Sequence, residues 1–94
     1  MVSYIGLLIT SIYPKFEIMT NIRDDKFLKA FGKRVRALRT QNGMSQYELS
    51  YASDIPKSQI VRIEQGEVNT GICSASAIAR ALSIDSKMLF EFND

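Results

Sequence analysis

The sequence predicts an all-α domain of five helices, and three observations support this fold class. From Asp24 onward, apolar residues recur at spacings of three and four, which places them on one face of successive helices. No segment after Asp24 alternates polar and apolar residues with the period of two that is typical of strands. The 94 residues, 46% hydrophobic and 23% charged, suit a single compact domain.

The first predicted helix covers residues 25–41. Asp24 or Asp25 can cap its N-terminus and place negative charge at the positive end of the helix dipole. Asn42-Gly43 supplies a left-handed stop at the other end. Its apolar face consists of Phe27, Leu28, Phe31, Val35 and Leu38.

A short second helix is expected over residues 46–52. Ser45 followed by Glu48 three residues later is the capping-box arrangement, in which each residue satisfies a backbone N–H of the other. Ser53-Asp54-Ile55-Pro56 then breaks the helix, because the residue before a proline is pushed out of helical geometry.

Three further helical segments follow: residues 57–65, which Gly66 ends, residues 72–82, which Thr70-Gly71 opens, and a last turn that Asp85 caps. The residues expected to share one core are Phe27, Phe31, Val35, Leu38, Leu49, Ile60, Ile63, Ile78, Leu82 and Leu89.

Residues 1–22 differ from the rest of the chain because they are rich in apolar residues and poor in charge. The apolar run is too short for a transmembrane helix, which needs about 20 residues, and it lacks the basic start of a signal peptide. Three interpretations stay open for this N-terminal extension: a strand that pairs with a second chain, a flap over the domain, or translation upstream of a true start at Met19. We favour the last.

The composition argues against several kinds of site. Histidine is absent, and Cys73 is the one cysteine, so the chain has no pair for a disulfide, too few ligands for zinc and no histidine general base. We therefore expect no catalytic residues, no metal and no cofactor, and we interpret the sequence as that of a protein without enzymatic activity. Cys73 is expected to be a small buried or half-exposed filler at the start of the fourth helix rather than a redox sensor.

The net charge of +2 hides an uneven distribution. Residues 23–39 carry seven basic side chains against Asp24 and Asp25, whereas the last dozen residues are mainly acidic. An anionic partner would prefer the first half of the chain. A solvated basic helix face is the plainer explanation of the cluster, so charge alone does not assign a partner.

Two short helices joined by a turn of about four residues form the helix-turn-helix, whose second helix lies in the DNA major groove. Two motifs agree with it: Ser45-Gln46-x-Glu48-Leu49 at the start of the second helix, and Ile60-x-Arg62-Ile63-Glu64-x-Gly66 at the end of the third. With these motifs the chain closely resembles the phage-repressor and Cro-like (XRE-type) family over residues 25–92. The resemblance implies a five-helix repressor-like DNA-binding domain over residues 23–94.

The resemblance also implies the DNA-binding residues. Gln46 occupies a position that typically contacts the DNA backbone. The positions on the recognition helix that point into the major groove correspond to Lys57, Ser58, Gln59 and Arg62. These residue types suit base edges, since Arg or Lys can donate to guanine, Gln can pair with adenine, and Ser fits several edges.

Arg39 and Glu64 match a pair that forms an ion pair between the first and third helices in many family members. Two positions depart from the family pattern. Asp54 replaces the usual turn glycine, and a left-handed backbone there would cost about 1 kcal/mol. Pro56 replaces the usual Ser or Thr cap of the recognition helix, which leaves the start of that helix uncertain by one residue.

The leading hypothesis is a cytoplasmic regulator from a bacterium or phage that binds double-stranded DNA in a sequence-specific manner, as a homodimer on a palindromic operator, without a membrane-bound part. The alternative is an antitoxin or adaptor whose main role is to bind a partner protein, with DNA binding serving autoregulation. The N-terminal extension distinguishes the two, because a translated apolar segment needs a partner for its surface. We expect residues 1–20 to be dispensable for DNA binding, because the chain from Met19 onward contains every matched motif.

Overall fold

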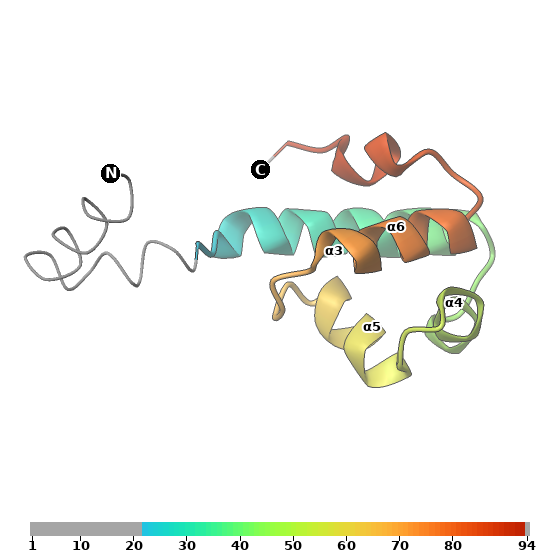
Figure 1. The fold of residues 1–94 in the computed structure, drawn as a ribbon. Coiled ribbons are helices and arrows are strands. Elements are labelled where there is room, and N and C mark those ends of the chain that lie inside the picture. The colour runs from blue at the N-terminus through green and yellow to red at the C-terminus, as the bar shows by residue number, and fades with distance from the viewer. Residues whose placement is uncertain (1–21, 94) are drawn as a thin grey trace, which may run out of the picture.

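The computed structural model describes residues 22–93, which form four α-helices and one 3₁₀ helix (Figure 1). The helices are α3 (Asp25–Gln41), α4 (Gln46–Ser53), α5 (Lys57–Glu64) and α6 (Ile72–Ala81), and the 3₁₀ helix is η1 (Ser86–Phe90). The all-α prediction is confirmed. The fifth helix is a single 3₁₀ segment rather than an α-helix. Cys73 is exposed in the first turn of α6, so the expectation of a buried or half-exposed side chain was wrong. The interpretations of residues 1–21 lie outside the described residues.

The helix ends follow the capping signals in the sequence. The Asp24 carboxylate accepts a hydrogen bond from the Phe27 N–H at 3.0 Å and caps α3. At the start of η1, the Asp85 carboxylate accepts a hydrogen bond from the Lys87 N–H at 3.1 Å and caps this helix. After α3 and α5 the backbone turns left-handed at Gly43 and Gly66, with φ of 70° and 73°. Local side-chain chemistry therefore accounts for where these segments begin and stop.

α3 is the longest of the described helices and runs along the whole domain (Figure 1). α5 and η1 pack on α3, while α6 packs on α4 and on η1. Gly32 allows α5 to approach α3 closely, because a Cβ atom at this position would lie 2.4 Å from the Ile63 carbonyl oxygen. Residues that are far apart in the sequence thus share one core.

Nine of the ten predicted core residues are buried, and Phe27 is the exception, with 37% of its surface exposed. The prediction for Phe27 was wrong because this residue lies in the first turn of α3, near one end of the domain. There its ring contacts aromatic rings from the C-terminal end of the chain: the centroids of Phe90 and Phe92 lie 6.4 and 5.2 Å away. Helical spacing identified the correct face of α3 but not how far the covering elements reach.

The turn between α4 and α5 has the left-handed residue that the sequence suggested. Asp54 has φ of 61° and ψ of 27°. The Ser50 hydroxyl donates to the Ile55 carbonyl at 2.5 Å, and the Ile55 N–H donates to the Ser53 hydroxyl at 3.3 Å. These two serines hold the turn in place of the missing glycine, and α5 begins at Lys57 directly after Pro56.

Candidate nucleic-acid interface

α4, the turn and α5 form a helix-turn-helix whose second helix presents a polar face. Ile60 and Ile63 of α5 are buried in the core, as is Glu64. On the outer side Lys57, Ser58 and Arg62 are exposed, and Gln59 is half-buried at the edge. The structure therefore exposes Lys57, Ser58 and Arg62 on the surface of one helix. Gln59 lies between that surface and the core.

The N-terminus of α5 has no side-chain cap. Pro56 occupies the cap position and contributes no side-chain hydrogen bond. The first backbone N–H groups of a helix lack intrahelical partners and carry partial positive charge, so they favour an anion nearby. Together with the Lys57 ammonium group, this end of α5 is electrostatically suited to a phosphate.

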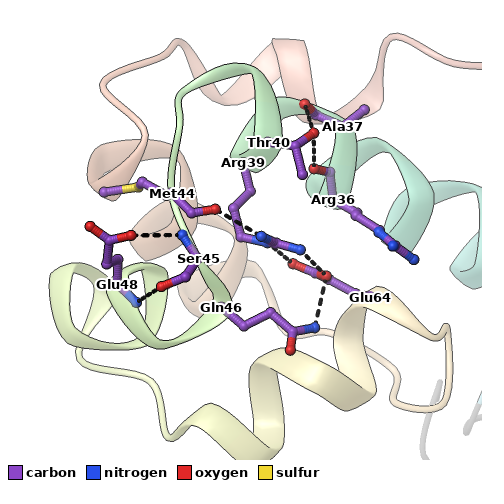
Figure 2. A network of polar contacts seen from close by, with 9 residues as sticks. All are labelled: Arg36, Ala37, Arg39, Thr40, Met44, Ser45, Gln46, Glu48 and Glu64. Atoms are coloured by element: carbon purple, nitrogen blue, oxygen red, sulfur yellow. Dashed lines mark hydrogen bonds and ion pairs between the residues drawn. The ribbon is translucent and has the colours of Figure 1, made fainter.

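A buried ion pair ties α5 to α3 (Figure 2). Arg39 Nε lies 2.6 Å from Glu64 Oε2, and Arg39 Nη2 lies 3.0 Å from Glu64 Oε1. The third guanidinium nitrogen, Nη1, donates to the Met44 carbonyl at 2.8 Å. This bidentate geometry fixes both side chains, so the orientation of α5 depends on Arg39 in α3.

Gln46 joins the same network. Its amide Nε2 donates to Glu64 Oε1 at 3.1 Å, so Glu64 receives hydrogen bonds from both α3 and α4 (Figure 2). Gln46 is half-buried at the start of α4. Sequence reasoning assigned Gln46 to the DNA backbone and missed this contact, because two residues 18 positions apart carry no local signal of proximity.

A capping box formed by Ser45 and Glu48 fixes the N-terminus of α4, which begins at Gln46. The Glu48 N–H donates to the Ser45 hydroxyl at 3.0 Å, and the Ser45 N–H donates to Glu48 Oε1 at 2.9 Å (Figure 2). The hydrogen bond from the Ser45 N–H, followed by that from its hydroxyl, lowers the pKa of the Glu48 carboxyl below its ordinary value.

We expect Ser45→Ala to lower the free energy of unfolding by about 1 kcal/mol, the usual loss for an N-cap. Because the folded-state pKa of Glu48 is lowered, the contribution of its charge is present above the unfolded carboxyl pKa and is lost as the pH falls through the folded one. Urea unfolding at neutral and acidic pH measures both effects. Ser86→Ala, at an exposed serine on η1, is the control, and equal losses in the two variants would contradict the prediction.

Part of the basic cluster of α3 faces away from this network. Lys26, Lys29, Lys33 and Arg34 line a groove of about 540 Å³ between α3 and the chain after η1, together with Glu91. Arg34 Nε also donates to the Met88 carbonyl at 2.8 Å. These four side chains therefore border the C-terminal end of the described chain, and Arg34 helps to hold η1 against α3.

A comparison with family models finds a match to the helix-turn-helix family over residues 35–88, more than half of the 94-residue chain. The chain belongs to the XRE-type helix-turn-helix family. The relatives that resemble it are named as control or controller proteins, and the helix-turn-helix of α4 and α5 lies within the matched residues.

Two kinds of relative support the membership in this XRE-type family. The control protein C.BamHI from Bacillus amyloliquefaciens is 33% identical over 63 residues, which cover 66% of this chain and 78% of that protein. The restriction-modification controller protein C.AhdI from Aeromonas hydrophila, whose crystal structure is known, shares 36% sequence identity with this chain. The two structures match with a TM-score of 0.66 over 67% of this chain and 96% of C.AhdI.

A further structural relative is the wild-type restriction-modification controller protein C.Esp1396I. It is 28% identical, with a TM-score of 0.65, over 69% of this chain and 86% of its own. Within residues 22–93 of this XRE-type protein, no helix is long and apolar enough to cross a bilayer. The same residues contain no group of three or more His, Cys, Asp or Glu side chains that could hold a metal ion.

Proposed function

We propose that this protein is a transcription regulator that recognises a specific double-stranded DNA sequence with α5. The observation that supports this most is the exposed polar face of α5, on a helix whose buried side is fixed to α3 by the Arg39–Glu64 ion pair. A rigid recognition helix loses little conformational entropy on binding and presents its side chains in one register.

Each predicted contact residue has a role that suits its position. Arg62 can donate two hydrogen bonds to guanine O6 and N7, and Gln59 can pair with adenine N6 and N7. Lys57 and Ser58, at the uncapped start of α5, can contact either a base edge or a phosphate. Gln46 is the proposed backbone contact, since its amide keeps a second N–H after binding Glu64.

The protein acts as a homodimer on a palindromic operator in this proposal. A two-fold dimer presents two copies of α5 to successive major grooves, with half-sites about 34 Å apart. Because the relatives are named as control and restriction-modification controller proteins, we further propose that the regulated genes belong to a restriction-modification system.

Selection of bound duplexes from a random pool by the purified full-length protein tests the proposal. We expect enrichment of a palindrome with half-sites one helical turn apart. Enrichment of a single unrepeated site would contradict the dimer. If no sequence is enriched, the result would favour the alternative function of an antitoxin or adaptor that binds a partner protein.

We expect Arg62→Ala to weaken binding to the cognate duplex by about 1 to 3 kcal/mol and to weaken binding to scrambled DNA much less. Arg62 lies on the same face as Ser58, one turn further along α5, so it is placed to reach a base edge. Titrations on both duplexes at several salt concentrations measure the difference.

Lys87→Ala is the control for this charge loss, because η1 and α5 lie on different sides of α3 (Figure 1). A phosphate role for Arg62 would instead weaken both duplexes alike and reduce the salt slope by about one. Unchanged binding on both duplexes would remove Arg62 from the interface.

A further inference from the structure

Helix α3 carries a row of basic side chains that the proposed DNA contact does not use. Lys26, Lys29, Lys33 and Arg36 follow one another at spacings of three, four and three residues, so they lie on one face of the helix. We call these four residues the basic face. All four are exposed. With a rise of about 1.5 Å per residue, the row is about 15 Å long.

The charge of the basic face is not neutralised within residues 22–93. The ion pairs in this part of the chain join Arg23 to Asp25 and Arg39 to Glu64, so no member of the basic face belongs to one. Like charges three and four residues apart on a helix repel each other. A partner with negative charge would relieve this repulsion, so the basic face suits an acidic ligand.

A groove beside the basic face gives this surface a shape as well as a charge. The groove has a volume of about 540 Å³ and lies between α3 and the chain after η1. The three lysines of the basic face line it, and its apolar lining comes from Ala30 and Phe92. Arg34 also lines the groove, but its Nε donates to the Met88 carbonyl and so holds η1 against α3. The groove can therefore take an apolar side chain while the lysines bind carboxylates.

A duplex bound to α5 would leave the basic face free. The buried side of α5 packs on α3 at Gly32, and its exposed side, with Ser58 and Arg62, points away from α3. Because successive helical residues point about 100° apart, Lys26 and Lys33 point roughly 100 to 120° away from Gly32. A ligand on the basic face and a duplex on α5 would therefore bind different sides of the domain.

The fold holds part of the basic face in place. Gly66, the second residue after α5, packs directly against Lys29, where a Cβ atom on the glycine would lie 2.7 Å from both Cα and Cγ of the lysine. The stem of Lys29 is thus fixed by the end of the recognition helix, although the residue as a whole stays exposed. A side chain held in this way loses less conformational entropy when it binds a carboxylate.

The groove favours a protein segment over a nucleic acid. Glu91 lines it opposite the lysines, on the chain after η1. A nucleic acid carries a phosphate at every nucleotide, so it would bring negative charge against the Glu91 carboxylate. A peptide can place a neutral side chain at this point, and an apolar one against Ala30 and Phe92.

We propose that the basic face and its groove dock an acidic segment of a second protein. Carboxylates of that segment bind the basic face, and one apolar side chain enters the groove between Ala30 and Phe92. A helix with acidic residues spaced three, four and three positions apart matches the basic face in length and in charge. This inference goes beyond the proposed function, and its main test requires no DNA.

The probe is a fluorescein-labelled, alanine-based helical peptide with four glutamates at these spacings and one leucine on the same side. Fluorescence anisotropy follows its titration with the full-length protein. A peptide with glutamine in place of each glutamate is the control for charge. We expect the glutamate peptide to bind at least about tenfold more tightly than the glutamine peptide, with an affinity that falls as the salt concentration rises.

Two double variants of equal net charge locate the contact. Lys29→Glu with Lys33→Glu reverses half of the basic face and should weaken binding of the glutamate peptide by at least about tenfold. Arg80→Glu with Lys87→Glu reverses two exposed charges on α6 and η1 and should weaken binding much less. Circular dichroism checks that the helices are kept. If the first variant loses them, the same two pairs of positions changed to glutamine provide the comparison.

Three outcomes would overturn the proposal. If the two peptides bind alike, or if neither binds, the basic face is a solvated surface. Equal weakening by the two double variants would mean that only the net charge of the protein attracts the peptide. Displacement of the peptide by a duplex would assign the basic face to nucleic acid. If the peptide binds as expected but no duplex is selected, the proposed function fails while this inference stands.

Discussion

Replacing Glu64 with alanine is expected to lower the free energy of unfolding by about 3 to 5 kcal/mol, the usual loss when one partner of a buried ion pair is removed. The Arg39 guanidinium, only 8% exposed, would keep its bond to the Met44 carbonyl but lose both carboxylate contacts. Gln46 would lose its acceptor as well. The cost arises because a buried cation remains without its counter-charge.

Urea unfolding of the purified variants measures this loss. Glu67→Ala is the matched control, since Glu67 is an exposed glutamate three residues further on and its removal should change stability by no more than about 0.5 kcal/mol. The double variant Arg39→Met with Glu64→Leu should recover most of the stability, because well-packed apolar residues often replace a buried pair without loss. A loss below that of Glu67→Ala would refute a structural role for the pair.

Gly32→Ala is expected to destabilise the fold by about 3 kcal/mol, the upper end of the range for overpacking. At an exposed position inside a helix the same change stabilises by roughly 0.5 to 1 kcal/mol. In α3, however, the added Cβ atom would lie 2.4 Å from the Ile63 carbonyl oxygen and 2.6 Å from that of Glu64. Both obstacles are backbone atoms, so α5 itself would have to move.

The sign of the change in unfolding free energy tests the Gly32 prediction, because Gly→Ala stabilises an exposed helix position and should destabilise this one. Lys33→Ala, at the exposed neighbouring position of α3, controls for the effect of alanine on helix propensity. Thermal and urea unfolding of both variants should show a loss for Gly32→Ala alone. A more stable Gly32→Ala protein would mean that α3 and α5 can separate without cost, which would contradict the close packing of the two helices.

Local signals in the sequence predicted most of the fold. The starts of α3, α4 and α5 follow from Asp24, the Ser45 and Glu48 capping box and Pro56, and the ends of α3 and α5 follow from Gly43 and Gly66. Each of these signals acts within a few residues of the position it defines. The 3₁₀ form of η1 was not predictable in this way. It packs against α3 and α6, and Arg34 binds the Met88 carbonyl, so contacts with distant residues act on this segment.

The candidate site was predictable only in part. The resemblance to the XRE-type family assigned Lys57, Ser58 and Arg62 to the outer side of α5, where the structure exposes them. It also paired Arg39 with Glu64, which lie in contact. The contact of Gln46 with the same carboxylate was missed, because it depends on the angle between α4 and α5, which no pattern within either helix specifies.

The sequence by itself determined the helical segments, their caps and the residue types on the outer side of α5, because helix periodicity and capping depend on neighbours within about four positions. Only the tertiary structure decided that Phe27 lies at the surface, that Gln46 binds Glu64, and that Ile22, Phe27, Ile72 and Phe90 line one groove. These features join residues up to 68 positions apart. Such contacts depend on how α3, α5 and α6 pack, and packing is a property of the whole core.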